Sequence, residues 1–251
     1  MTPEMLPEEE PQPQGLGEGS RLTGVFFEPA KTFADVAERP GFWAPLILAI
    51  LVGIAYNAAL GQRLGFDRVV DQQMQGRLAR LSGDQLEQAQ KGIEMQKRFA
   101  PVGAYIGAVL VPVILGLIAS GALFGMVAGV LSVPLRFKQV FAIWMYSAMP
   151  ILVFYLLAIV VMYIKPPDDF YTLNPLVFNP GAFLDPGKPT KFLYSLFSSL
   201  DLFNFWRIWV LIVGLKAAAG KKLSMGGATL AVLLPWGVMV LIGGVMAGIF
   251  M

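Results

Sequence analysis

The chain has 251 residues, of which 56% are hydrophobic and 14% are charged. Soluble domains carry about 25% charged residues, and the apolar residues here are clustered rather than periodic, which is typical of membrane proteins. A net charge of +2, without a basic patch that contains aromatics, argues against nucleic acid as a partner. The absence of Cys and His excludes thiol nucleophiles, imidazole acid–base catalysis and His–Cys zinc sites.

Two unlike segments precede the first long apolar stretch. Residues 1–21 are rich in Pro, Glu, Gln and Gly, and this composition predicts a disordered tail. Within residues 24–39, the apolar side chains of Phe33, Val36 and Ala37 share one helical face, whereas the charged residues lie elsewhere on the wheel. We therefore expect a short amphipathic helix, which either lies in the membrane interface or packs against the bundle.

Five stretches are apolar and long enough to cross a bilayer. The uncharged stretch from Ala100 to Leu135 is too long for one straight crossing and too short for two, so it predicts one long or tilted helix. The expected spans are 42–61, 101–131, 140–164, 200–219 and 226–250, and Pro150 is expected to break the third span in mid-course. Residues 62–100 are polar with apolar stripes, which predicts an amphipathic helical hairpin between the first two spans. The fold class is thus an all-α polytopic membrane bundle, formed by one domain over 22–251.

Basic residues in the short connections predict how the chain is oriented. Two turns carry five basic residues and no acidic residue: Arg136, Lys138, Lys216, Lys221 and Lys222. The positive-inside rule places both turns in the cytoplasm, so the N-terminus is expected inside and the C-terminus outside. The polar segment between the first two spans, with seven basic and five acidic residues, then lies outside against that rule.

Four polar side chains within the expected spans form a candidate intramembrane cluster. Asn57 lies in the first span, and Asp201, Asn204 and Arg207 lie in the fourth. Arg207 is nine residues from Lys216, which places it about 13 Å inside the membrane, where an arginine costs at least about 2.5–3.5 kcal/mol. Two interpretations remain open: a polar clamp that fixes helix order, or a polar site for a solute, ion or lipid headgroup. No catalytic, cofactor-binding or metal-ligating residue is expected.

Small residues recur every four positions on three spans, a spacing that allows helix backbones to approach closely. They are Gly53 in the first span, Gly121, Gly125 and Gly129 in the second, and Gly244 and Gly248 in the last. This pattern predicts tight packing within the bundle, with a dedicated dimer face as the alternative.

Three motifs occur in chain order. They are Phe26-Phe-Glu-Pro29 before the first span, Asp201-Leu-Phe-Asn-Phe-Trp206 in the fourth, and Lys-Lys-Leu-Ser224 before the last. Together they resemble the Yip-domain family, the Ypt/Rab-interacting proteins, over about residues 22–250. The resemblance implies five spans, a cytoplasmic N-terminus and an outward C-terminus. The chain lacks an Asp-Leu-Tyr-Gly-Pro motif and is more similar to the prokaryotic branch, which implies a bacterial inner membrane and no Rab partner.

The leading hypothesis is a non-enzymatic scaffold or organiser of the lipid bilayer, which acts through helix packing, homo-oligomers and other membrane proteins. The alternative is a small-solute or ion transporter or channel with Asp201, Asn204 and Arg207 in its path. An enzyme that acts on lipids is the weakest hypothesis, because the sequence has no GxxxxGK[ST], HExxH or GxSxG motif.

Overall fold

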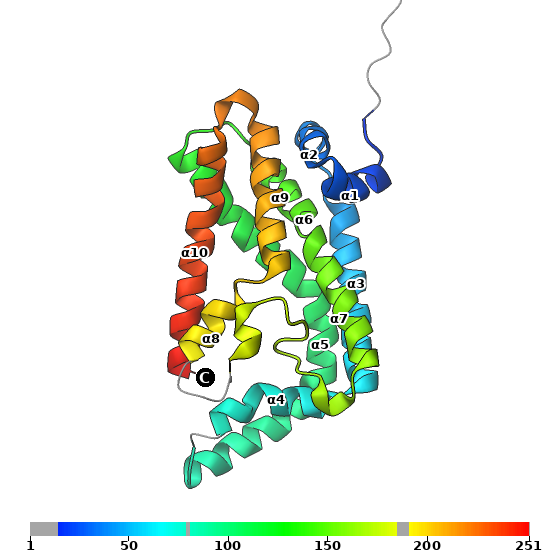
Figure 1. Ribbon diagram of the computed structural model, residues 1–251, viewed down its shortest axis with the longest axis vertical. Helices are drawn as coiled ribbons and strands as arrows, with labels where there is room; N and C mark the ends of the chain where they lie inside the picture. Colours follow the sequence, from blue (N-terminus) through cyan, green and yellow to red (C-terminus); the bar gives the residue numbers. More distant parts are fainter. Residues whose placement is uncertain (1–14, 79–80, 185–190, 251) are drawn as a thin grey trace, which may run out of the picture.

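The computed structural model describes residues 15–78, 81–184 and 191–250, and it shows an elongated bundle of helices (Figure 1). All regular structure within these residues is helical. Five helices of the described chain are long and apolar enough to cross a membrane. The predicted fold class, an all-α bundle with five spans, is therefore confirmed.

The N-terminal segment forms two short helices at one end of the bundle, α1 (Glu18–Phe27) and α2 (Pro29–Glu38) (Figure 1). The predicted face of α2 is buried, because Phe33, Val36 and Ala37 all point into the core. Helix α1 was not expected. It begins inside the segment predicted to be a disordered tail, of which residues 1–14 lie outside the described residues.

The first span, α3 (Trp43–Arg63), leads to the opposite end of the bundle, where α4 (Phe66–Leu78) and the first half of α5 (Asp84–Phe124) form the predicted hairpin (Figure 1). An ion pair between Lys97 and Asp71 joins the two arms of this hairpin, with 2.8 Å between Nζ and Oδ1. Helix α5 then continues without interruption into the second span, with two prolines inside it. Hairpin and span are thus built on one 41-residue helix.

The third span bends at its proline, as expected. A π-helical turn (Gly125–Val130) ends the second span, and α6 (Phe137–Ser147) and α7 (Met149–Ile164) follow. The break lies at Ala148, two residues before Pro150. Proline has no N–H to donate and clashes with the preceding turn, so the helix restarts there.

The fourth span is short, and irregular chain fills the space beyond it. Helix α8 (Lys191–Ser198) lies beside the C-terminal part of α10 (Met225–Phe250), below the start of α9 (Leu202–Ala219) (Figure 1). Two short 3₁₀ turns precede α8, Pro167–Asp169 and Pro180–Phe183, and a third, Gly220–Lys222, joins α9 to α10.

The core lies where α2, α6 and α9 meet. Phe33 of α2 and Ile143 of α6 are fully buried, and both face Gly214 of α9. A Cβ atom built on Gly214 would lie 2.8 Å from Ile143 Cγ2 and 3.0 Å from Phe33 Cγ. The absence of a side chain at Gly214 is thus what allows α2 and α6 to pack against α9.

We expect Gly214→Ala to destabilise the bundle, because the new methyl group would collide with two fully buried side chains. The matched control is Gly237→Ala on α10, where a Cβ meets nothing within 4 Å. Both substitutions gain the same helix propensity, so the difference in the free energy of unfolding isolates the collision. Overpacking predicts a difference of about 1–3 kcal/mol, measured by thermal or denaturant unfolding in detergent micelles. Equal stability of the two variants would contradict this account of the core.

Candidate functional site around Arg207

Arg207 is the sixth residue of α9, about one and a half turns from the start of that helix. Nine residues separate it from Lys216 in the last turn, or about 13 Å along the axis at 1.5 Å per residue. A charge at this depth in hydrocarbon is costly unless it is paired, hydrated or turned toward the interior of the bundle. The neighbours of Arg207 therefore decide how the bundle tolerates it.

An aromatic ring holds the guanidinium group. Cζ of Arg207 lies 3.9 Å from the ring centre of Trp144 on α6. Such a cation–π contact contributes about 0.5–2 kcal/mol, with the larger values where water is excluded. Within the described residues, the Nε–H group of Arg207 is buried without a hydrogen-bond partner. Among the residues that the structure describes, no carboxylate forms an ion pair with this side chain.

Arg207 borders two cavities. The smaller, of about 70 Å³, lies among α5, α6, α9 and α10 and is also lined by Asn204. The larger, of about 420 Å³, lies among α3, α5, α6 and α7 and is also lined by Asn57 and Tyr155. Trp144 lines both cavities as well, so the stacked pair lies between them.

The larger cavity exists because small residues line α3 and α5. Gly53 of α3 approaches Ala108 of α5 closely, since a Cβ on this glycine would lie 3.4 Å from the Cβ of Ala108. At Gly107, which also lines the cavity, a Cβ would have nothing closer than 3.9 Å. The two helices thus touch at some points and leave open volume at others.

A third cavity, of about 480 Å³, adjoins the larger one, because Tyr56, Asn57 and Ala104 line both. It extends to α4 and to the first half of α5, where Gln73 and Gln96 contribute polar side chains. Open space therefore extends from the surroundings of Arg207 toward the end of the bundle that carries the hairpin.

Asp201 and Asn204 make local hydrogen bonds. Asp201 Oδ1 accepts from the Phe203 N–H at 2.8 Å and caps α9, an arrangement that stabilises a helix start. Asn204 Nδ2 donates to the Ser199 carbonyl oxygen at 3.0 Å. Within the described residues, neither side chain bonds to Arg207. Both therefore stabilise the start of α9, and of the two only Asn204 shares a cavity with the arginine.

Asn57 is the predicted polar residue that shares the larger cavity with Arg207. Its Nδ2 atom donates to the Gly53 carbonyl oxygen at 2.9 Å, within its own helix. The predicted cluster is thus assembled only in part: Asn57 shares the larger cavity with Arg207, Asn204 shares the smaller one, and Asp201 lines neither. In the described part of the chain, no three acidic residues gather closely enough to hold a metal ion.

The predicted packing glycines fall into two groups. At Gly53 and Gly244, a Cβ would meet neighbouring helices, the latter at 2.9 Å from the ring of Phe192. On the second span, a Cβ would meet nothing within 4 Å at three positions: Gly121 at the end of α5, and Gly125 and Gly129 in the π-helical turn that follows it. The surroundings of Gly248 lie outside the described residues. The end of α5 and this turn thus present a face of small residues, the α5 face, that no other described part of the chain covers.

A family model for the Yip1 domain matches residues 23–246, which include the Arg207 cavities and all five spans. The chain belongs to the Yip1 domain family. Among curated proteins and solved structures, none matches it. The resemblance drawn from the three motifs is thereby confirmed, and the cavities are features of a Yip1 domain.

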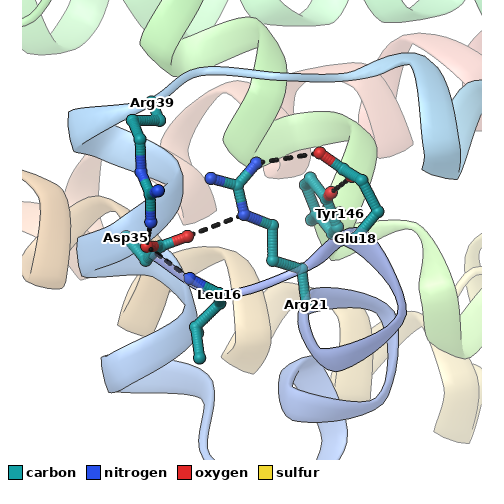
Figure 2. A network of polar contacts seen from close by, with 6 residues as sticks. All are labelled: Leu16, Glu18, Arg21, Asp35, Arg39 and Tyr146. Atoms are coloured by element: carbon teal, nitrogen blue, oxygen red, sulfur yellow. Dashed lines mark hydrogen bonds and ion pairs between the residues drawn. The ribbon is translucent and has the colours of Figure 1, made fainter. Parts of the chain in front are cut away.

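A second polar network lies just before and at the start of the Yip1 domain (Figure 2). The Arg21 side chain is only 5% exposed, and its Nε donates to Asp35 Oδ2 at 2.7 Å. Its Nη1 donates to Glu18 Oε1 at 3.1 Å, and the hydroxyl of Tyr146 donates to the other oxygen of Glu18. These bonds connect α1 with α2 and with α6, and so attach the N-terminal helices to the end of the bundle.

Asp35 is the centre of this network. Burial disfavours its charged form, but the Leu16 N–H and the guanidinium groups of Arg21 and Arg39 outweigh that effect, so the pKa of Asp35 is lower than usual. A lowered pKa in the folded state means that the carboxylate stabilises the fold above the unfolded pKa of about 3.9. This contribution is lost as the pH falls below that value.

The sequence does not predict this network, because the composition of residues 1–21 places Arg21 in the expected disordered tail. Leu22, Val25 and Phe26 follow it at helical spacing, and all three are buried or half-buried in the structure. That spacing was the available signal. The distant partner Tyr146 could not have been found from it.

We expect Asp35→Asn to loosen the N-terminal helices of the Yip1 domain, because Arg21 would keep its charge and lose its closest carboxylate. Leaving such a group without its partner costs about 1–3 kcal/mol. Amide hydrogen exchange over residues 16–39 should therefore accelerate. Glu38→Gln is the matched control, because Glu38 is an exposed acid at the end of the same helix.

The pH dependence provides a second readout of the same contact. In the unmodified protein, protection of residues 16–39 should fall below about pH 4 after correction for the intrinsic exchange rate. In Asp35→Asn it should already be low at neutral pH. Equal protection in both proteins at pH 7 would show that the network does not hold α1 in place.

Proposed function

We propose that this Yip1-domain protein is a non-enzymatic membrane scaffold, which assembles with further copies of itself and with other membrane proteins through helix packing. The observation that carries the proposal is the uncovered α5 face, formed by Gly121 at the end of α5 and by Gly125 and Gly129 in the π-helical turn that follows. Lipid gives no hydrophobic drive for helices to associate, so close packing between small residues is what brings them together. Exposed apolar side chains such as Leu117 and Ile118 flank this face and can extend the contact.

We further propose a bacterial inner membrane with the N-terminal helices on the cytoplasmic side. The connection before α6 and the turn between α9 and α10 lie at the same end of the bundle as α1 and α2 (Figure 1). Both connections are basic, which favours the cytoplasm. Some charges of the hairpin at the other end are offset by ion pairs, including Lys91 with Glu87 and Lys97 with Asp71.

A small-solute or ion transporter is the second candidate. The adjoining cavities that lead from the hairpin end toward Arg207 favour it. Uptake of a labelled anion into protein-containing liposomes, abolished by Arg207→Met, would support transport. The same flux in empty liposomes would leave the scaffold as the better account.

We expect Gly125→Leu to weaken self-association, because the larger side chain keeps the α5 helices of two copies apart. Since nothing lies within 4 Å of a Cβ at Gly125, the substitution fits the monomer without strain. Overpacking at the contact predicts a loss of about 1–3 kcal/mol of association free energy. Energy transfer between donor- and acceptor-labelled copies in liposomes, at several protein-to-lipid ratios, measures this change.

Gly237→Leu on α10 is the matched control, because a Cβ there also meets nothing within 4 Å and Gly237 lies outside the α5 face. Its association should equal that of the unmodified protein. Unchanged energy transfer for Gly125→Leu, or no transfer at all for the unmodified protein, would overturn the proposed role of this face.

A further inference from the structure

We propose that the 420 Å³ cavity beside Arg207 binds an amphiphile, with an anionic carboxylate or phosphate group at the guanidinium and an apolar chain along α3 and α5. This proposal does not depend on the scaffold role, because the cavity lies inside one copy of the chain. The starting observation is a half-buried cation at membrane depth whose Nε atom is buried, with an aromatic neighbour and, among the described residues, no anion.

The contact with Trp144 leaves Arg207 able to bind such a group. Cζ of Arg207 lies over the Trp144 ring, 3.9 Å from its centre. Arginine carries five N–H donors in a planar fork, and a cation–π contact at Cζ does not use them up. A carboxylate or phosphate accepts two parallel hydrogen bonds from arginine, and this pairing is stronger than a bond between neutral groups. The ligand would thus supply the counter-charge that no described side chain supplies.

The walls of the cavity define the rest of the ligand. Glycine, alanine and branched aliphatic residues form most of the lining, and the polar groups beside Arg207 are few: Tyr56, Asn57 and Tyr155. A sugar or nucleotide would leave most of its hydroxyl groups unpaired against such walls, at a free-energy cost. An alkyl chain needs no such partners. The volume falls within the range of about 300–1,000 Å³ that small-molecule sites occupy.

The adjoining cavity gives the anionic group a route inward. It shares Tyr56 and Asn57 with the ligand cavity, and it is lined by Gln73, Gln96 and Thr172 toward the hairpin. These side chains can hydrogen-bond an anion on its way from the membrane boundary to Arg207. The leaflet on the hairpin side is therefore the expected source of the ligand.

Trp144 provides a direct readout, because bromine atoms on a nearby chain quench tryptophan fluorescence. The protein is reconstituted in phosphatidylcholine nanodiscs at alkaline pH and titrated with a dibrominated C18 fatty acid. We expect saturable quenching that disappears in Trp144→Phe. The brominated alcohol of the same chain, which partitions into the bilayer without a charge, should give only non-saturating quenching.

Two substitutions distinguish the contribution of the Arg207 charge to binding from the contribution of the cavity volume. Arg207→Met removes the cation, and Gly107→Leu fills the cavity at a position where a Cβ has nothing closer than 3.9 Å. Each should weaken the saturable component at least about tenfold, as expected for the loss of a charge-assisted pair or of the binding volume. The matched controls Lys216→Met and Gly92→Leu, on the same two helices but outside the cavity lining, should bind as the unmodified protein does.

Parallel titrations with brominated phosphatidylglycerol and phosphatidylcholine identify the source of the anion. Saturable quenching by the fatty acid or by phosphatidylglycerol, but not by phosphatidylcholine, supports the proposal and names the ligand. Equal quenching by acid and alcohol, equal quenching by both phospholipids, or retained binding in Arg207→Met would overturn it. If Arg207→Met does not fold, two results still test the proposal: the comparison of the fatty acid with the alcohol, and the binding of the Gly107→Leu variant.

Discussion

Hydrocarbon offers no hydrogen-bond partners, and this constraint decides the form of most of the chain. Every backbone N–H and C=O group that crosses the membrane has to bond within its own segment, which in a five-span protein means helices. Where proline removes a donor in the third span, the helix restarts at Met149 rather than leaving an irregular stretch in lipid. Irregular chain within the described residues is found beyond the start of α9 and at the ends of the bundle (Figure 1).

The same constraint makes Arg207 conspicuous. A bundle held together by small residues and apolar contacts has little to offer a cation, and the side chain is held by the face of Trp144. The spacing that allows α3 and α5 to approach at Gly53 also leaves open volume beside the guanidinium group. Small residues on α3 and α5 thus have two consequences: they allow the two helices to touch at some positions, and they leave a cavity at others.

The N-terminal helices join the bundle through both buried apolar contacts and charged contacts. Phe33 fills the space left by Gly214, while Arg21, Asp35 and Glu18 connect α1, α2 and α6 near the membrane boundary. Ion pairs are more useful at that boundary than in lipid, because the groups remain close to water when they are not paired. The apolar core and the polar network therefore act on the same two short helices from different sides.

The sequence by itself determined the number of spans, the break at Pro150, the hairpin and the buried face of α2, because all of these follow from local hydrophobicity and helical period. It also identified Arg207 as the exceptional residue, since one charge in an apolar stretch is visible without a structure. Only the tertiary structure decided what surrounds that charge: Asp201 caps its own helix, Trp144 takes the place of an acid, and cavities lie on both sides. It also decided which glycines are covered and that Tyr146 reaches Glu18 across 128 residues. Such contacts depend on how whole helices are placed against one another, and no local pattern along one helix contains that information.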